Sequence, residues 1–163
     1  MIGIQNNLAY ITGMGFDAIW ISPVIDNTPG GYHGYWMRNL NKVNAHFGSN
    51  SDLSSMVNAA HGDGVWVMVD VVGNHVGPVD HDYSSIVPFN QASHYHDCSN
   101  CPNDCQIQDF NNQQQVELCR LAGLPDLNQT NPFVANFLYN WISNMVSQYQ
   151  FDGLRIDTVP EVS

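Results

Sequence analysis

The sequence predicts an α/β fold in which helices cover the outside of a parallel sheet. Three stretches in which apolar residues recur at helical spacing are each followed by a short apolar run of strand length. Repeated helix and strand units in this order are typical of parallel sheets. At 163 residues, of which 44% are hydrophobic, the chain is long enough for a globular domain with a core.

The first two units lie in the N-terminal part of the chain. Apolar residues recur at helical spacing between residues 1 and 15, glycines indicate the end of that helix, and DAIWISP predicts a buried strand. Ser51 and Asp52 indicate the start of a second helix, which glycines again end. The run VWVMVDVV then predicts a second buried strand.

The third unit follows a long irregular stretch. Asn131 and Pro132 are an N-cap and first-turn pair, and the helix they begin leads to a strand at Phe151. Residues 73–130 lack sustained periodicity, and a stretch of this length is usually functional or forms a small subdomain. The sequence therefore predicts a sheet-forming part at 1–72, an excursion at 73–130, and a return to the sheet at 131–163.

Composition excludes several kinds of partner. The formal charge of -11 would repel nucleic acid and anionic lipid surfaces, and no apolar run reaches the length of a membrane span. The chain shows no signal peptide, so either the protein is intracellular or its start is missing. The four cysteines of the excursion favour the second, secreted interpretation, and the sequon at Asn128 is compatible with export.

Those four cysteines allow two interpretations. Disulfide bonds are preferred, because this composition suits an oxidising compartment. A zinc site made of four thiolates is the alternative, for which the close spacing of Cys98 and Cys101 provides one half.

Two carboxylates lie where parallel α/β proteins keep their active sites. Asp70 and Asp157 each stand near the carboxyl end of a predicted strand, and Asp70 lies on the face opposite the valines of its strand. Arg155 shares a face with Asp157 and can balance its charge. Such a pair supports nucleophilic or acid/base chemistry, but a purely structural ion pair has the same spacing.

The chain resembles the α-amylase family of glycoside hydrolases, in particular its secreted fungal-type members. The resemblance runs through nearly the whole chain in the family's order, in the motifs GMGFDAIWISPV, YHGYW, FGSNSDL, DVVGNH, LPDLN and FDGLRIDTV. It implies that Asp157 is the catalytic nucleophile and that Arg155 orients it. It also implies substrate-binding roles for His33, Tyr35, Trp36, Asp70 and His75.

The resemblance further implies that Ca²⁺ bridges the excursion to the sheet. Asn74 and Asp126 match side-chain ligands, and Glu117 matches a backbone carbonyl donor. Glu161 stands where the family usually has a histidine whose backbone carbonyl binds calcium, so we expect a carbonyl ligand there. Pro160 and Glu161 replace a Lys-His pair that contacts sugar in the family, which puts those contacts in doubt.

The family's disulfide in the same insertion matches Cys105 and Cys119. Cys98 and Cys101 are additional to that pattern, and we expect them to pair with each other.

The resemblance implies a (β/α)8 barrel, of which the chain covers helix 1 to strand 4, with the small calcium-binding domain inserted after strand 3. A complete barrel needs about 250 residues, and the family's general acid ends the fifth strand. We therefore expect an incomplete piece of an α-amylase that, alone, is inactive and prone to association because its sheet edges and inner face are open.

The expected activity of the parent is retaining endo-hydrolysis of α-1,4-glucosidic bonds, with starch or maltooligosaccharide as the partner and a monomeric state. An α-glucosidase or transglycosylase of the same family is one alternative, since it shares these motifs. A non-catalytic fragment that binds calcium and glucan is the other.

Overall fold

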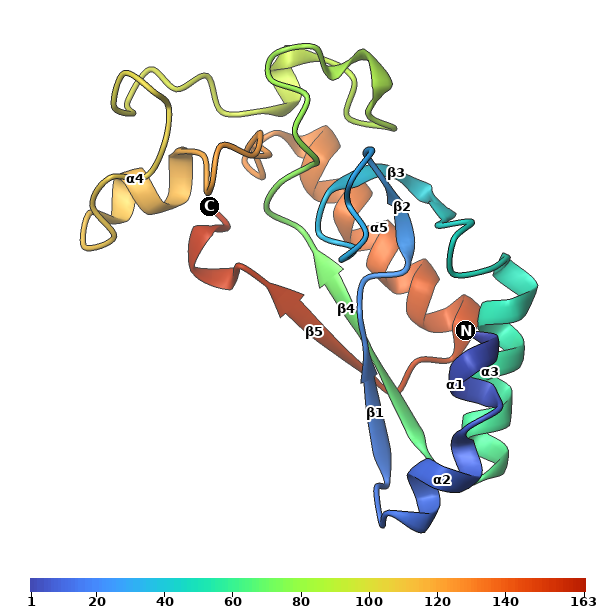
Figure 1. The fold of residues 1–163 in the computed structure, drawn as a ribbon. Helices are drawn as coiled ribbons and strands as arrows, with labels where there is room; N and C mark the ends of the chain where they lie inside the picture. Colours follow the sequence, from blue (N-terminus) through green and yellow to red (C-terminus); the bar gives the residue numbers. More distant parts are fainter.

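A computed structural model describes residues 1–163 and confirms the α/β fold (Figure 1). Its helices and strands, in chain order, are α1 Ile2–Gln5, α2 Leu8–Gly13, β1 Ala18–Ile21, β2 Ile25–Asn27, β3 Met37–Val43, α3 Asn50–Gly62, β4 Trp66–Val72, α4 Gln113–Leu118, α5 Pro132–Tyr149 and β5 Gly153–Asp157. Three short 3-10 helices add η1 Tyr83–Ser85, η2 Ala92–His94 and η3 Val159–Glu161.

The main sheet is parallel and has the strand order β1-β4-β5. In the register of β4 and β5, Asp70 lies opposite Arg155 and Val72 lies opposite Asp157. Because parallel strands end at the same edge of a sheet, this register brings the polar ends of β4 and β5 together. The predicted strand order along the chain is confirmed.

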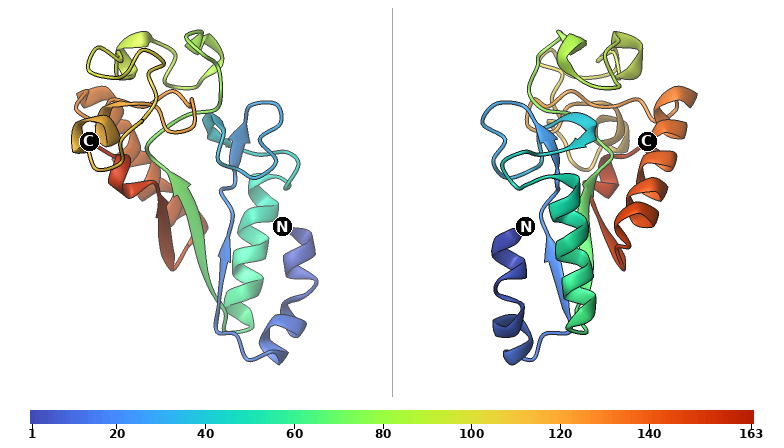
Figure 2. Two further views of the ribbon diagram at one scale, coloured as in Figure 1. Left: turned by 60° about the vertical axis from the view of Figure 1, so that its left-hand side comes forward. Right: turned by 90° about the vertical axis from the view of Figure 1, so that its right-hand side faces the viewer.

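The valine face of β4 packs in the hydrophobic core. Val67, Val69 and Val71 are at most 1% exposed, and they belong to a cluster of 28 buried hydrophobic residues. Helices α3 and α5 cover this side of the sheet (Figure 2). Alternation of side chains along a strand predicts this arrangement, and it leaves Asp70 on the other face.

The other face of the sheet is open. Trp20 and Trp66 lie on it and are 56% and 67% exposed, and in the barrel that we expect this face would be the interior. That such a surface drives association stays a prediction.

The N-terminal helix is divided in two, contrary to the single helix that we predicted. The amide of Asn7 donates a hydrogen bond to the carbonyl of Gly3 at 2.7 Å, at the junction between α1 and α2. Asparagine side chains compete in this way for backbone groups and are poor in helix interiors. Leu8 is nevertheless buried and Ile11 packs against the core, as the spacing indicated.

Helix α3 begins before the predicted start. Its N-cap is Ser49, whose hydroxyl accepts a hydrogen bond from the Asp52 amide while the Asp52 carboxylate accepts from the Ser49 amide. This reciprocal pair is a capping box, so Asp52 is the third helical residue rather than the first. For α5 the prediction is confirmed, because Asn131 caps the Phe133 amide at 2.9 Å and Pro132 follows as the first helical residue.

Strands β2 and β3 form an antiparallel hairpin, and the loop between them contains YHGYW. This hairpin was not predicted. Gly34 in that loop has φ +94°, and a Cβ there would lie 2.7 Å from the carbonyl oxygen of Pro23. Only glycine allows this close approach, so the loop packs directly on Pro23, shortly before β2.

The excursion lies beyond the carboxyl ends of β4 and β5 and contains only short elements (Figure 1). An isolated bridge between His75 and Asp126 ties its end to the segment that follows β4, and a second bridge joins Tyr95 to Leu127 within it. Its irregular character was predicted, whereas the division at 1–72, 73–130 and 131–163 stays a prediction.

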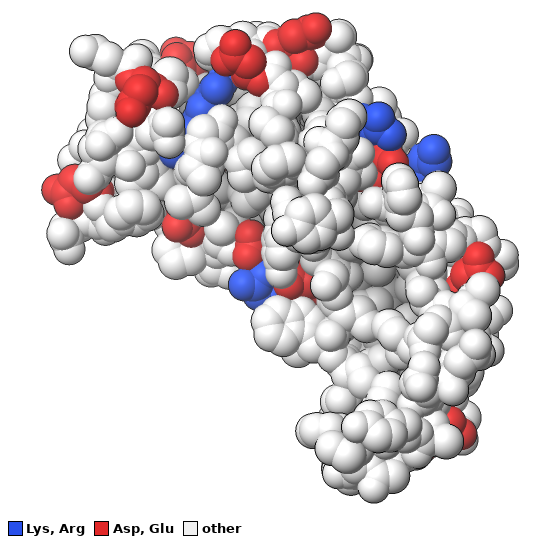
Figure 3. Space-filling view, viewed as in Figure 1, with Lys and Arg blue, Asp and Glu red and all other residues white.

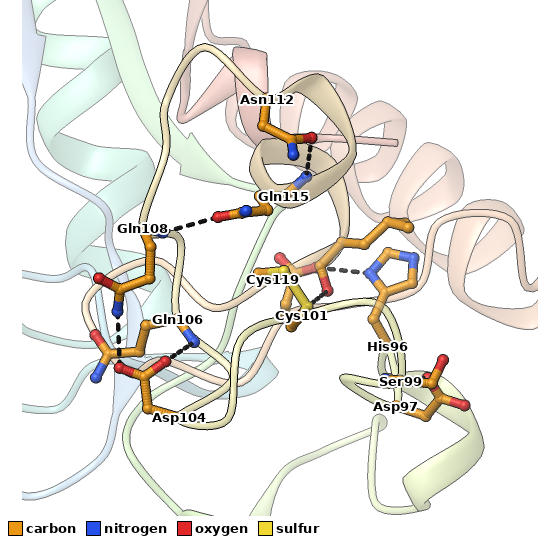
Figure 4. Close-up of a disulfide and its surroundings, with 12 residues drawn as sticks. His96, Asp97, Ser99, Cys101, Asp104, Gln106, Gln108, Asn112, Gln115 and Cys119 are labelled. Atoms are coloured by element: carbon orange, nitrogen blue, oxygen red, sulfur yellow. Dashed lines mark hydrogen bonds and ion pairs between the residues drawn. A yellow bond between two sulfur atoms is a disulfide. The ribbon is translucent and has the colours of Figure 1, made fainter.

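Both predicted cysteine pairings are wrong. The disulfide joins Cys101 to Cys119, with their Cα atoms 5.7 Å apart, while Cys98 and Cys105 are free thiols (Figure 4). Two consecutive turns close with the hydrogen bonds Cys101 N to Cys98 O and Cys105 N to Pro102 O. Sγ of Cys101 lies 3.3 Å from the carbonyl oxygen of Leu118, the last residue of α4 and the neighbour of Cys119. The zinc alternative is also wrong, because two of its four thiolates form this bond.

Acidic groups are scattered over the molecular face in Figure 3 and basic groups are few, in keeping with the net charge. None of the helices combines the length and the apolar character that crossing a bilayer requires.

Candidate active site

Asp70 is the centre of the polar cluster at the end of β4. Its side chain is 0% exposed. Nη1 of Arg155 lies 3.0 Å from both carboxylate oxygens, and the Tyr35 hydroxyl donates to Oδ2 at 2.9 Å. A buried carboxylate is stable only when its oxygens are satisfied in this way.

Arg155 joins Asp70 to Asp157. The same Nη1 also donates to Oδ1 of Asp157, whose side chain is 14% exposed. Hydrogen bonding to Asp70 is the main cause that raises the pKa of Arg155, with Asp157 adding to it. The guanidinium also lies over the ring of Trp20, 5.3 Å from its centroid. Asp157 is thus held in one orientation at the open face of the sheet.

The YHGYW loop supplies Tyr35 and His33. Burial and the hydrogen bond to Asp70 raise the pKa of Tyr35, so its hydroxyl stays a proton donor at neutral pH. The Tyr35 amide donates to Nδ1 of His33 at 3.1 Å. The His33 ring stacks on Tyr35 and meets Trp36 edge to face, at centroid distances of 5.8 and 5.0 Å. These rings form one aromatic group beside Asp70.

His75 closes the cluster from the segment after β4. It is 3% exposed, and its Nε2 lies 3.2 Å from the carbonyl oxygen of Tyr35, which assigns the proton to Nε2. Burial lowers the pKa of His75, while the negative charge of Asp157 acts in the opposite sense. The ring is therefore neutral at pH 7, and Nδ1 is left as an acceptor for the Asn74 amide at 3.4 Å.

Three other buried oxygens in this part of the molecule lack hydrogen-bond partners. Oδ1 of Asn74, Oδ1 of Asp126 and Oε2 of Glu161 are each buried and without a hydrogen-bond partner. Because the Asn74 amide nitrogen faces His75, its oxygen points away from His75. Buried acceptors without donors are costly, and oxygen-ligating cations satisfy them.

Asp126 is fixed by the pairing of its segment with the chain after β4. Leu127 N donates to Asn74 O at 2.8 Å, and Oδ2 of Asp126 lies 2.6 Å from Nδ1 of His96. The pKa of Asp126 is raised to about 6, chiefly by burial, with the hydrogen bond to His96 acting in the opposite sense.

The carbonyl of Glu117, near the end of α4, accepts no hydrogen bond, whereas its carboxylate accepts one from Gln113 at 2.7 Å. Helix α4 contacts η3, which ends at Glu161. No group of three or more His, Cys, Asp and Glu side chains is arranged to hold a metal. A cation site here must therefore use the Asn74 amide and main-chain carbonyls together with acidic groups.

Most predicted site residues come together in these two groups. Sequence reasoning missed the contact of Tyr35 with Asp70 and the pairing of His96 with Asp126, because both join segments far apart in the chain. The sequon residue Asn128 bonds to Thr130 through Oδ1, and its glycosylation stays a prediction.

The chain is similar to known alpha-amylases. The family model "Alpha amylase, catalytic domain" matches residues 1–163. Alpha-amylase mde5 of Schizosaccharomyces pombe is 43% identical over 98% of this chain and 32% of its own length. The chain thus spans about a third of the length of the curated relatives that it matches.

Solved structures agree with this match. The alpha-amylase of Malbranchea cinnamomea is similar with a TM-score of 0.89 and 41% identity, over 98% of this chain and 35% of that one. The alpha-amylase of Geobacillus thermoleovorans, solved in complex with acarbose, gives a TM-score of 0.87 and 39% identity, over 99% of this chain and 34% of that one.

Proposed function

This chain belongs to the alpha-amylase family of glycoside hydrolases, and on this premise we propose that it carries the nucleophile of a retaining site for α-1,4-glucosidic bonds in starch. The observation that supports the proposal most strongly is the attachment of Asp157 to Arg155, which is itself anchored on the buried Asp70. A nucleophile in double displacement must be a fixed carboxylate at the sugar-binding face.

The aromatic group supports a sugar as the ligand. Tyr35 and Trp36 are half-buried beside Asp70, and aromatic faces suit the apolar faces of glucose rings. His75 is neutral, so it can hydrogen-bond a sugar hydroxyl without introducing charge. The relative from Geobacillus thermoleovorans was solved with acarbose, which favours an oligosaccharide ligand for this chain as well.

Double displacement also needs a carboxyl group that donates a proton to the leaving oxygen. Asp70 is unsuited to this role because Arg155 and Tyr35 engage its oxygens and its side chain is 0% exposed. Glu161 is unsuited as well, since its Oε2 is buried behind the site. We therefore expect a polypeptide made of these 163 residues alone to release no reducing sugar from starch.

We further propose that Ca²⁺ is held by Asn74, Asp126 and the backbone carbonyls of Glu117 and Glu161. The unpartnered buried oxygens of Asn74 and Asp126 fit a hard cation. Bound calcium would join the excursion to the end of β4 and so fix His75, the neighbour of Asn74, in the site. The disulfide between Cys101 and Cys119 favours a secreted protein.

The test of the catalytic proposal compares Asp157→Asn with Asp63→Asn, an exposed aspartate outside the site, in the protein that contains this chain. We expect Asp157→Asn to lower the release of reducing sugar from starch by about 1,000-fold or more, and Asp63→Asn to leave it unchanged. The first product should carry the α-anomeric configuration by NMR. Full activity of Asp157→Asn, or a β-anomer, would overturn the proposal.

A further inference from the structure

Glu161 has an unusual environment for an acidic side chain. It ends the short helix η3, in which Pro160 occupies the first turn, and its Oε2 is buried without a hydrogen-bond partner. None of the ion pairs in the structure includes Glu161. A buried carboxylate oxygen with neither donor nor cation is strongly unfavourable, so this arrangement needs a positively charged partner.

Asp126 is another carboxylate with an unsatisfied oxygen. Its Oδ1 is also buried and without a hydrogen-bond partner. Oδ1 of Asn74 is the third oxygen of this kind, and the bridge between His75 and Asp126 brings the two ligand segments side by side. Three acceptors without a donor therefore come from the chain after β4, the end of the excursion and η3.

Neighbouring basic groups do not satisfy these oxygens. Arg120 bonds to the carbonyl of Asp80, and the ring of His96 contacts Oδ2 of Asp126 rather than Oδ1. No Lys or Arg forms an ion pair with Asp126 or Glu161, so a bound cation is the partner that these oxygens fit.

We propose that the carboxylate of Glu161 is itself a direct ligand of the calcium ion, in addition to the backbone carbonyl expected at this position. This inference rests on the proposed calcium site. It gives the ion two carboxylates, from Asp126 and Glu161, with the neutral oxygens of Asn74 and the Glu117 carbonyl completing the set. The number of charged ligands is a main determinant of calcium affinity, so the second carboxylate tightens the site.

The placement of η3 gives the ligand a structural role. Helix η3 follows directly after the strand that ends in Asp157, and it contacts α4 of the excursion, close to the C-terminal end in Figure 1. An ion held by the Glu161 side chain therefore ties the chain beyond the nucleophile to the excursion. A carbonyl-only contact would make the same link with less charge.

The experiment is a calcium titration of the protein that contains this chain, by isothermal calorimetry after a chelator has removed bound metal. Glu161→Gln keeps the backbone carbonyl and the side-chain shape but removes the charge. Asp63→Asn is the control, because Asp63 is an exposed acidic residue outside the proposed ligand set. Asp126→Asn tests the site as a whole.

We expect Glu161→Gln to weaken calcium binding by about tenfold or more in Kd. Asp63→Asn should leave the Kd within about twofold, and Asp126→Asn should weaken binding at least as much as Glu161→Gln. A Glu161→Gln protein that binds like the unmodified protein while Asp126→Asn fails would overturn the inference and leave the calcium proposal intact. Failure of the unmodified protein to bind calcium would overturn both.

A thermal melt distinguishes the loss of a calcium ligand from a folding defect. In chelator, Glu161→Gln should melt at the same temperature as the unmodified protein or higher, because the substitution removes the charge from a group whose Oε2 is buried without a partner. With saturating calcium its gain in Tm should be smaller. A variant that melts lower in chelator and gains as much from calcium as the unmodified protein would show a purely structural role for Glu161 and would contradict the inference.

Discussion

Replacing Asp70 by asparagine measures how strongly the ionic cluster holds the ends of β4 and β5 together. The carboxylate receives contacts at 3.0 Å from Arg155 on both oxygens and one at 2.9 Å from the Tyr35 hydroxyl. Asparagine keeps the shape but places an NH₂ group where one oxygen was, and this group faces the guanidinium donor. One charged hydrogen bond is lost, and the guanidinium of Arg155 loses its buried counter-charge.

A hydrogen bond to a charged group contributes about 1.5–3 kcal/mol to stability. The Arg155 side chain is 34% exposed, so water takes over part of the lost interaction. We therefore expect the lower part of that range, about 2 kcal/mol, for Asp70→Asn. Tyr35→Phe removes one bond to the same carboxylate, which Arg155 still engages, so we expect a loss at the lower end of the range, about 1.5 kcal/mol.

Urea unfolding of the protein at pH 7 provides the assay. The midpoint should fall for both variants while the slope of free energy against urea stays the same, which shows that stability rather than compactness has changed. A loss for Asp70→Asn below about 0.5 kcal/mol, or one no larger than that for Tyr35→Phe, would refute the reasoning that the charged pair dominates this cluster.

Three further predictions concern other parts of the molecule. Gly77→Ala should destabilise the protein by about 1–3 kcal/mol in the same urea assay, because its Cβ would lie 2.3 Å from Oγ1 of Thr28; an unchanged midpoint would contradict this. Burial lowers the pKa of His94 in the folded state, so the protein should lose stability as the pH falls from about 6.5, the unfolded-state pKa, through the lower folded-state pKa. His94→Gln should therefore show a smaller drop in Tm between pH 7 and 5 than the unmodified protein. An equal drop would contradict this. Peptide mapping without reductant should recover Cys101 linked to Cys119, and recovery of another pairing would disprove this connectivity.

The order of helices and strands follows from local pattern. The valines of β4 and the cap at Asn131 are short-range signals that the packing reinforces, so both were predicted. The start of α3 was placed too late because Ser49 and Ser51 are both suitable caps, and only the reciprocal bonds with Asp52 select Ser49. The β2 and β3 hairpin was missed because β2 has only three residues.

Part of the site could also be predicted from the sequence pattern. Alternation along β5 placed Arg155 beside Asp157, and position at the strand end placed Asp70 nearby. The register of β4 against β5 decides that one guanidinium joins both carboxylates, and register depends on the whole sheet.

The cysteine pairing shows a similar limit. Spacing alone leaves several connectivities open for four cysteines. The turns that begin at Cys98 and Pro102 decide which thiol faces Cys119, and these turns depend on the residues between the cysteines.

Covalent trapping tests the central claim, that Asp157 is the nucleophile, most directly. A fluorinated α-glucosyl fluoride carries a leaving group that needs no acid catalyst, so the glycosyl-enzyme accumulates if the nucleophile is competent. The protein that contains this chain should gain one glycosyl unit, and peptide mass spectrometry should place it on Asp157. A label on a different carboxylate, or no label under conditions in which the protein hydrolyses starch, would contradict the account.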